Sequence, residues 1–302
     1  MFQNKVSRNL LILHLTVIVW GFTGILGALI SVASYHLVWY RVLIAFVSLF
    51  VYFKISKQPL QTSGRLLLQL LLTGGLVGLH WMLFFQSIKS SNVSITLVCM
   101  SSVTLFTAIL EPLLNKRKIE SLELLIGLFI IFGIYLIFKF EARYVLGIAL
   151  GLLCAVCASI FTIINSHLIK VSKASVISFY EMIGAWLWIS LFMVCSNKFN
   201  GTMALNLSDF LYLLLLGTIC TSAAYVAGVS VMKELSAFRV ALITNLEPIY
   251  GILLALIFFK QEEKMSLGFY AGALIVLGSV FLYPVLKSKL AAKKLAKTFP
   301  PA

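Results

Sequence analysis

Acidic side chains are scarce in this sequence. It has 10 Asp and Glu against 24 Lys and Arg over 302 residues, and Asp209 is the only aspartate. A single aspartate excludes catalysis by an aspartate pair and metal sites built from several aspartates. The sequence also has no H-E-x-x-H, no Walker-type glycine loop and no G-x-S-x-G, which are the signatures of common hydrolase sites. We therefore predict no catalytic residue, no metal, no cofactor and no direct use of ATP.

Charged residues of either sign are few, at 11% of the chain, whereas 61% of the residues are hydrophobic. Both values differ widely from those of a soluble domain and place the chain among membrane proteins. The net charge of +14 does not indicate nucleic acid as a partner, because most basic residues lie between apolar runs or in the tail. Cys154 and Cys157 form a C-x-x-C inside an apolar run, where we interpret them as small packing residues.

Ten apolar runs follow one another, each long enough to cross a bilayer as a helix. They predict an all-α integral membrane protein with ten transmembrane helices, at about 10–30, 34–53, 66–87, 92–113, 121–138, 145–168, 175–195, 208–231, 236–259 and 266–286. Lys and Arg are concentrated in the segments on the same side as the N-terminus, so both termini are predicted to be cytoplasmic. The basic tail, 287–302, is expected to lie near anionic lipid.

The two halves of the chain are similar when one is shifted by 145 residues (236 − 91 = 145) onto the other. We interpret the similarity as a duplication that gives five-helix repeats at 10–140 and 145–286. Five crossings place the start of the second repeat on the opposite side of the membrane, so we predict two inverted repeats with the substrate site between them. The glycine pairs that keep their spacing are Gly127 with Gly272 and Gly133 with Gly278.

The predicted helix 236–259 contains an acid and a proline at its middle, Glu247 and Pro248. Proline removes a backbone donor and disfavours helical geometry in the preceding residue, which predicts a kink here. A carboxylate at mid-membrane costs about 3 kcal/mol or more unless it is protonated, paired or facing water. We predict that Glu247 contacts substrate and is the candidate for proton coupling, with Thr244 and Asn245 as polar neighbours. The alternative is a permanently protonated acid that holds the kink.

Arg41 and Glu181 occupy matching positions when helix 34–53 is set on helix 175–195. Their depths predict a pair that contacts substrate or breaks during alternating access; a structural pair, or side chains that reach to the nearer interface, is the alternative. His80 and Tyr225 likewise match and are expected either to line a cavity or to pack. The predicted substrate-binding residues are Trp20, Arg41, His80, Trp81, Glu181, Tyr225, Thr244, Asn245 and Glu247.

Three local features accompany this topology: Trp20-Gly21 in the first predicted helix, Tyr40-Arg41 in the second, and the segment from Ser236 to Pro248 with Glu262 after it. Together with the two five-helix halves, they resemble the EamA family of the drug/metabolite transporter superfamily. The resemblance implies a ten-helix carrier of small metabolites, including amino acids and related compounds, and many members are exporters. It also implies a bacterial inner membrane as the location, and a homodimer is left open.

The first half departs from this pattern at two positions. Val103 stands where the second half has Pro248, and Arg117 stands where it has Glu262. A mechanism that treats the two halves alike is therefore expected to hold less well for the first half.

Two other classes of function compete with the predicted ATP-independent exporter of a small metabolite. The first is an integral-membrane enzyme acting on a lipid-linked substrate, with His80 and Glu247 as acid and base; it would need polar residues clustered at one membrane face. The second is a scaffold or channel subunit, which would not need two inverted halves. Saturable, selective flux into proteoliposomes would favour the carrier.

Overall fold

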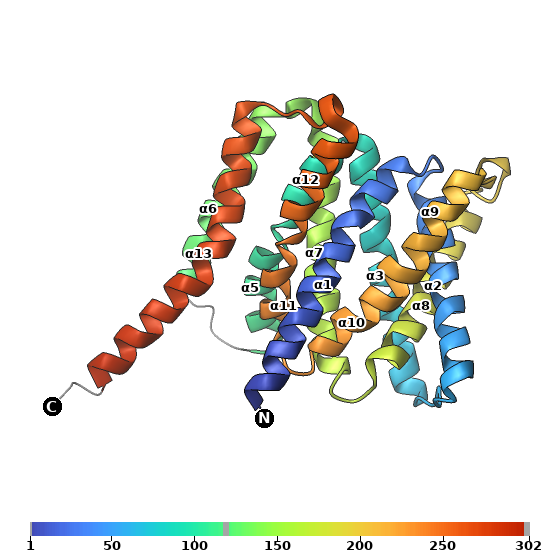
Figure 1. The fold of residues 1–302 in the computed structure, drawn as a ribbon, viewed down its shortest axis with the longest axis horizontal. Coiled ribbons are helices and arrows are strands. Elements are labelled where there is room, and N and C mark those ends of the chain that lie inside the picture. The colour runs from blue at the N-terminus through green and yellow to red at the C-terminus, as the bar shows by residue number, and fades with distance from the viewer. Residues whose placement is uncertain (1, 117–120, 299–302) are drawn as a thin grey trace.

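The computed structural model describes the backbone of residues 2–116 and 121–298. Within these ranges the chain is helical and contains no strand. Arg117, which the repeat comparison sets against Glu262, lies outside the described residues, as do residues 299–302 of the tail. The N- and C-termini lie on the same side of the helical bundle, at the bottom of Figure 1.

The first half contains α1 (Phe2–Leu29), α2 (Ser34–Ser56), α3 (Gly64–Ser90), α4 (Val93–Met100), α5 (Val103–Leu114) and α6 (Ser121–Phe140). The second half contains α7 (Val145–Leu168), α8 (Ala174–Cys195), α9 (Leu207–Gly217), the π-helix η3 (Thr218–Ala223), α10 (Ala224–Val231), α11 (Ala237–Thr244), α12 (Glu247–Phe259) and α13 (Leu267–Thr298). Short 3-10 turns complete the fold at η1 (Ala142–Tyr144), η2 (Gly201–Met203) and η4 (Lys260–Glu263).

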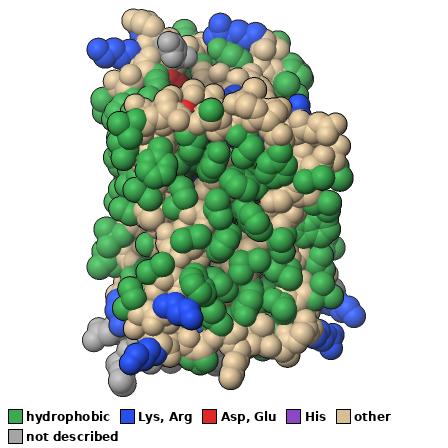
Figure 2. Space-filling view, turned by 90° about the vertical axis from the view of Figure 1, so that its right-hand side faces the viewer, with side chains coloured by type: hydrophobic (Ala, Val, Ile, Leu, Met, Phe, Trp, Pro, Cys, Tyr) green, Lys and Arg blue, Asp and Glu red, His purple; other side chains and the backbone are tan. Residues whose placement is uncertain are grey.

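Nine spans in the described ranges are long and apolar enough to cross a membrane. The predicted run 121–138 corresponds to α6, whose apolar part, Leu125–Phe140, is shorter than the other spans. Figure 2 shows a broad hydrophobic band on one face of the molecule, with Lys and Arg gathered at its two ends. The prediction of an all-α, multi-pass membrane protein is confirmed, whereas the count of ten spans stays a prediction.

Two membrane helices are broken near their middle, one in each half of the chain. The first break, at 101–102, separates α4 from α5, and the second, at 245–246, separates α11 from α12. Pro248 lies at the start of α12, as the sequence predicts. The break between α4 and α5 has no proline; there the hydroxyls of Ser101 and Ser102 donate to the carbonyls of Leu97 and Cys99, at 3.3 and 2.6 Å. Serine hydroxyls that bond nearby carbonyls compete with the helical ladder and often bend a helix, so Val103 in place of proline does not prevent the break.

Contacts between the halves occur in matching pairs. Helix α1 packs against α10 and α12, and its counterpart α7 packs against α3 and α4. Helix α3 packs against α8, and in the matching contact α2, the counterpart of α8, packs against α9 and η3. Helix α6 packs against its own counterpart, α13. The α6–α13 pair is antiparallel, because the Phe140 end of α6 meets Gly268 at the start of α13. Counterparts that run in opposite directions are the arrangement expected of inverted repeats.

Glycine allows the α3 and α8 backbones to approach closely. A Cβ added to Gly184 on α8 would overlap the backbone carbonyl of Leu71, and one added to Gly74 on α3 would overlap the carbonyl of Glu181. Small residues at such crossings are common where membrane helices pack without a hydrophobic driving force. The α3–α8 crossing, where the two halves meet, is therefore closely packed and intolerant of added volume.

We expect Gly184→Ala to destabilise the protein by about 1–3 kcal/mol, because the overlapping atom belongs to a backbone that cannot rotate away. Gly278→Ala on α13 is the matched control, since a Cβ there has no neighbour within 4 Å. The measurement is the thermal unfolding of each variant in detergent or nanodiscs. Equal unfolding temperatures for the two variants would show that the crossing tolerates separation of the helices.

Candidate functional site

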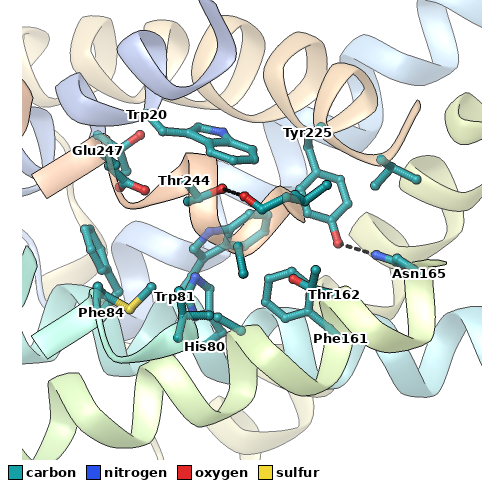
Figure 3. A pocket seen from close by; sticks show the side chains of 18 of the residues that line it. Trp20, His80, Trp81, Phe84, Phe161, Thr162, Asn165, Tyr225, Thr244 and Glu247 are labelled. Atoms are coloured by element: carbon teal, nitrogen blue, oxygen red, sulfur yellow. Dashed lines mark hydrogen bonds between the residues drawn. The ribbon is translucent and has the colours of Figure 1, made fainter. Parts of the chain in front are cut away.

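A cavity lies where the two halves meet, beside both helix breaks. It contains about 830 Å³ of empty space, including the part that is open to the outside. Figure 3 shows aromatic rings around this space, with the carboxyl group of Glu247 at one end and Asn165 at the other. The lining residues are Trp20, Thr23, Arg41, His80, Trp81, Phe84, Met100, Val103, Ala158, Phe161, Thr162, Asn165, Tyr225, Gly228, Val229, Met232, Val240, Ala241, Thr244 and Glu247.

The cavity extends toward the face of the bundle that carries the termini. Its wall includes Asn165 near the end of α7, Met232 just after α10 and Val240 near the start of α11. These three helix ends lie at the bottom of Figure 1. Access is therefore biased to one face, as expected for a carrier in one of its two end states.

On the side of the cavity away from the termini, the helices are closely packed. A Cβ on Gly251 of α12 would overlap Leu97 of α4, so these two helices already touch there. Farther toward that face, the Glu263 carboxylate accepts the backbone N–H groups of Val93 and Ser94, at 2.9 and 3.0 Å. A carboxylate at a helix N-terminus satisfies unpaired donors and interacts favourably with the helix dipole. This contact fastens the second half of the chain to the first.

The structure places most of the predicted substrate-binding residues on the cavity wall: Trp20, Arg41, His80, Trp81, Tyr225, Thr244 and Glu247. Glu181 and Asn245 are buried but do not line the cavity. Sequence reasoning did not select Asn165, Thr162, Phe84 and Phe161, which do line it. A polar residue near the end of an apolar run, as Asn165 is, was the available signal.

Arg41 is buried, with 1% of its surface exposed, and it is held from two sides. Its Nε donates to Thr221 Oγ1 at 2.6 Å, and its Cζ lies 4.3 Å from the centroid of the Trp81 ring. One terminal nitrogen, Nη1, has no hydrogen-bond partner among the described residues. A guanidinium stacked on an aromatic ring and fixed at Nε is oriented in advance to bind an anionic group with its remaining donors.

Arg41 and Glu181 are not paired with each other in this structure, and their predicted role in transport stays a prediction. Within the described part of the chain the two side chains form no ion pair, and each has other partners. The two residues occupy matching positions along their helices, but their side chains contact different residues: Arg41 bonds Thr221 and Glu181 bonds Tyr225. Arg41 and Glu247 instead line the same cavity.

The π-helix η3 supplies the partner that holds Arg41. In it, Thr221 Oγ1 donates to the carbonyl of Leu216 at 2.6 Å while accepting from Arg41, and Ser222 Oγ donates to the carbonyl of Ala45 at 3.0 Å. Single π-turns inside α-helices occur frequently at functional sites. The small polar residues between 218 and 222, inside an otherwise apolar run, were the sequence signal for this feature.

Glu247 begins α12 and is buried, with 9% of its surface exposed. The N-terminus of a helix favours a negative charge, so the break provides a local reason to accommodate this acid. Its expected polar neighbours bond elsewhere: Thr244 donates to the carbonyl of Val240 at 2.9 Å, and Asn245 donates to Thr104 Oγ1 on α5 and to the carbonyl of Ala241. Asn245 therefore links the two broken helices and does not serve the cavity.

His80 presents a defined tautomer. Its Nδ1 lies 3.0 Å from the carbonyl oxygen of Cys154, which can only accept, so Nδ1 carries the hydrogen. In the neutral imidazole, the other ring nitrogen, Nε2, is then a hydrogen-bond acceptor. With Arg41 as donor and Glu247 as a carboxyl group, the cavity wall combines a cation, an acid, a neutral acceptor and several aromatic faces. This set can bind a small molecule that carries both charges and an apolar part.

The sequence matches the EamA-like transporter family over residues 8–139 and again over residues 145–283. The chain belongs to the EamA-like transporter family. Two successive matches are the two repeats of that family, which is consistent with the drug/metabolite transporter superfamily. The residues that line the cavity come from both matched segments of this EamA-like protein.

Two similar proteins were found, one by sequence and one by structure. An uncharacterized transporter of Clostridium kluyveri (strain ATCC 8527 / DSM 555 / NBRC 12016 / NCIMB 10680 / K1) is 22% identical over 257 residues, which is 81% of each chain. A protein of known crystal structure, described without an activity, has a TM-score of 0.69 and 14% identity, and the match covers 92% of this chain and 98% of that one. The structural match supports the fold alone. Family and relative together indicate a membrane transporter.

Proposed function

We propose that this protein is a secondary, ATP-independent exporter of a small metabolite such as an amino acid or a related compound. The observation that carries the proposal is the cavity between the repeats, in which one Arg41 donor has no partner among the described residues and Glu247 offers a carboxyl group. A carboxylate on the substrate would bind Arg41, and an ammonium group would bind Glu247. The aromatic side chains Trp20 and Trp81 would cover the apolar part.

The proposed transport mechanism is alternating access by two repeats. The proposed unit is two inverted five-helix repeats, 10–140 and 145–286, with ten spans in all and with helices broken beside the substrate. Rocking of one repeat against the other would close the accessible side and open the side sealed near Leu97 and Gly251. We place the protein in the bacterial inner membrane with both termini and the tail 287–302 in the cytoplasm. Its partners are the substrate and the bilayer, with no nucleic acid, and a homodimer is left open.

Export against a gradient requires an energy source, for which we propose a proton gradient acting at Glu247. A proton and the ammonium group of the substrate would compete for the same carboxyl group. Competition of this kind makes proton entry and substrate exit alternate at one site, which is antiport. Thr244 and Asn245 remain in the proposal only as neighbours that shape the break.

The test is counterflow in proteoliposomes that contain the purified full-length protein. Vesicles are loaded in turn with each unlabelled amino acid, and uptake of the same labelled amino acid is followed, with protein-free vesicles as the background. We expect saturable uptake of a subset that carries both an ammonium and a carboxylate group. Uptake of none of them above background would reject the proposed substrate class, and consumption of a lipid-linked substrate would favour the membrane enzyme.

A further inference from the structure

A second buried carboxyl group, Glu181, lies directly behind the cavity wall. None of its surface is exposed, and it does not line the cavity. Tyr225 Oη donates to Glu181 Oε2 at 2.8 Å, and Asn165 Nδ2 donates to the same oxygen at 3.3 Å. Tyr225 and Asn165 both line the cavity and bond each other at 3.1 Å, as the dashed line in Figure 3 shows. Two uncharged side chains thus separate this acid from the substrate space.

The neighbours of Glu181 provide no compensating charge. Helix α8 packs against α2, α3 and α10, and α7 contributes Asn165 to the same group; the buried ionisable side chains of these four helices near mid-membrane are Arg41, His80, Cys154, Cys157 and Tyr225. Arg41 bonds Thr221 and His80 bonds Cys154, and neither forms an ion pair with Glu181 in the described part of the chain. The other Lys and Arg residues of α2 and α3 lie in the end turns of these helices.

The hydrogen bonds of Glu181 are also one-sided. Both donors bond Oε2, whereas Oε1 has no hydrogen-bond partner among the described residues. An ionised carboxyl group with one bare oxygen is costly inside a membrane, and a proton on Oε1 removes that charge while Oε2 keeps both donors. Glu247 differs from Glu181, because it lines the cavity, as Arg41 does.

We propose that Glu181 is a proton-binding site of this protein, separate from the substrate-binding groups. The strength of its hydrogen bond with Tyr225, which lines the cavity, then depends on whether Glu181 is protonated. A proton passes from hydronium to one carboxylate oxygen of Glu181: one O–H bond forms on the acid, one breaks on the hydronium, and a water molecule is left. The ionised acid holds the Tyr225 hydroxyl firmly through a charge-assisted hydrogen bond, whereas the neutral acid holds it more weakly. The hydroxyl is then freer to turn toward a ligand in the cavity. This role in transport rests on the proposed function, whereas proton binding itself does not.

The experiment is infrared difference spectroscopy of the purified full-length protein in nanodiscs, between acidic and alkaline pH, with the proton itself as the probe. Protonation of a buried carboxyl group produces a carbonyl-stretching band. We expect Glu181→Gln to lose one such band and Tyr225→Phe to move the same band to higher frequency, because the carbonyl oxygen loses a donor. Glu234→Gln, the same change at an exposed glutamate, is the control and should leave the band in place.

Each outcome decides the proposal without any transported substrate. If the spectrum of Glu181→Gln equals that of the wild type, Glu181 does not change its protonation and the proposal is wrong. If Glu181→Gln does not fold, Tyr225→Phe still decides, because an unmoved set of bands contradicts the assignment. Loss of the band together with failure of every amino acid in counterflow would retain the proton site and reject the proposed substrate class. Glu247→Gln, run in parallel, should remove a different band and leave that of Glu181.

Discussion

Arg41→Gln is expected to reduce the transport efficiency, kcat/KM, by about 100-fold. The substitution removes the donor and the positive charge that the substrate carboxylate would meet in the cavity. Loss of one partner of a buried, hydrogen-bonded charge pair costs about 3 kcal/mol, which corresponds to a factor of about 100. The amount of folded protein should not fall in parallel, because the Arg41 charge is itself costly to bury. The measurement is initial-rate counterflow, normalised to the protein recovered in the vesicles.

Two further variants serve as comparisons for this result: Arg41→Lys, which keeps the charge, and Arg239→Gln, which changes an exposed arginine. Lysine keeps the charge but lacks the planar fork that lets Arg41 bond Thr221 and offer further donors at the same time, so we expect an intermediate loss of about tenfold. Arg239 is exposed, and its replacement by glutamine should leave transport unchanged. Normal transport by Arg41→Gln, with normal recovery, would mean that Arg41 is structural and that the substrate charge binds elsewhere.

Glu247→Gln is expected to abolish accumulation driven by a proton gradient while exchange persists with a raised KM. Glutamine keeps the size of the side chain and its ability to accept a hydrogen bond, but it neither binds a proton in exchange for substrate nor carries the charge that attracts an ammonium group. Exchange needs only the movement between the two end states, whereas accumulation needs coupling to the proton. Both quantities are measured in the same batch of vesicles, with and without an imposed pH difference.

Glu234→Gln is the matched control for this variant, since Glu234 is exposed. It should accumulate substrate as the wild type does. If Glu247→Gln also accumulates substrate to the wild-type level, Glu247 is an acid that only holds the helix break, and proton coupling must be sought at another group. Loss of both exchange and accumulation, with intact folding, would instead assign Glu247 to substrate binding alone.

The membrane class and the main architecture follow from the sequence by itself. Apolar runs of sufficient length leave no other way to satisfy the backbone in lipid than helices, which is why an all-α, multi-pass fold could be predicted with approximate boundaries. The break at Pro248 was predictable as well, because a proline acts on its own helix and on the residue before it. Such effects are local along the chain, and the sequence contains them completely.

The depth of polar side chains was equally predictable, since it depends only on position along a helix. This is why Arg41, His80, Tyr225 and Glu247 were selected, and the structure does bring them to one cavity. The break between α4 and α5 was not predicted, because it depends on serine side chains bonding carbonyls, which periodicity does not reveal.

Only the tertiary structure decided which side chains meet. Depth predicted Arg41 beside Glu181, but the rotation of each helix about its own axis and the choice of neighbouring helices place Arg41 on Thr221 and Trp81. The same rotation turns Glu181 to Asn165 and Tyr225, and turns Asn245 away from the cavity to Thr104. Helix rotation depends on how all the helices pack together, including the glycine crossing of α3 and α8. No single segment of the sequence contains that information, because it arises from contacts between residues far apart in the chain.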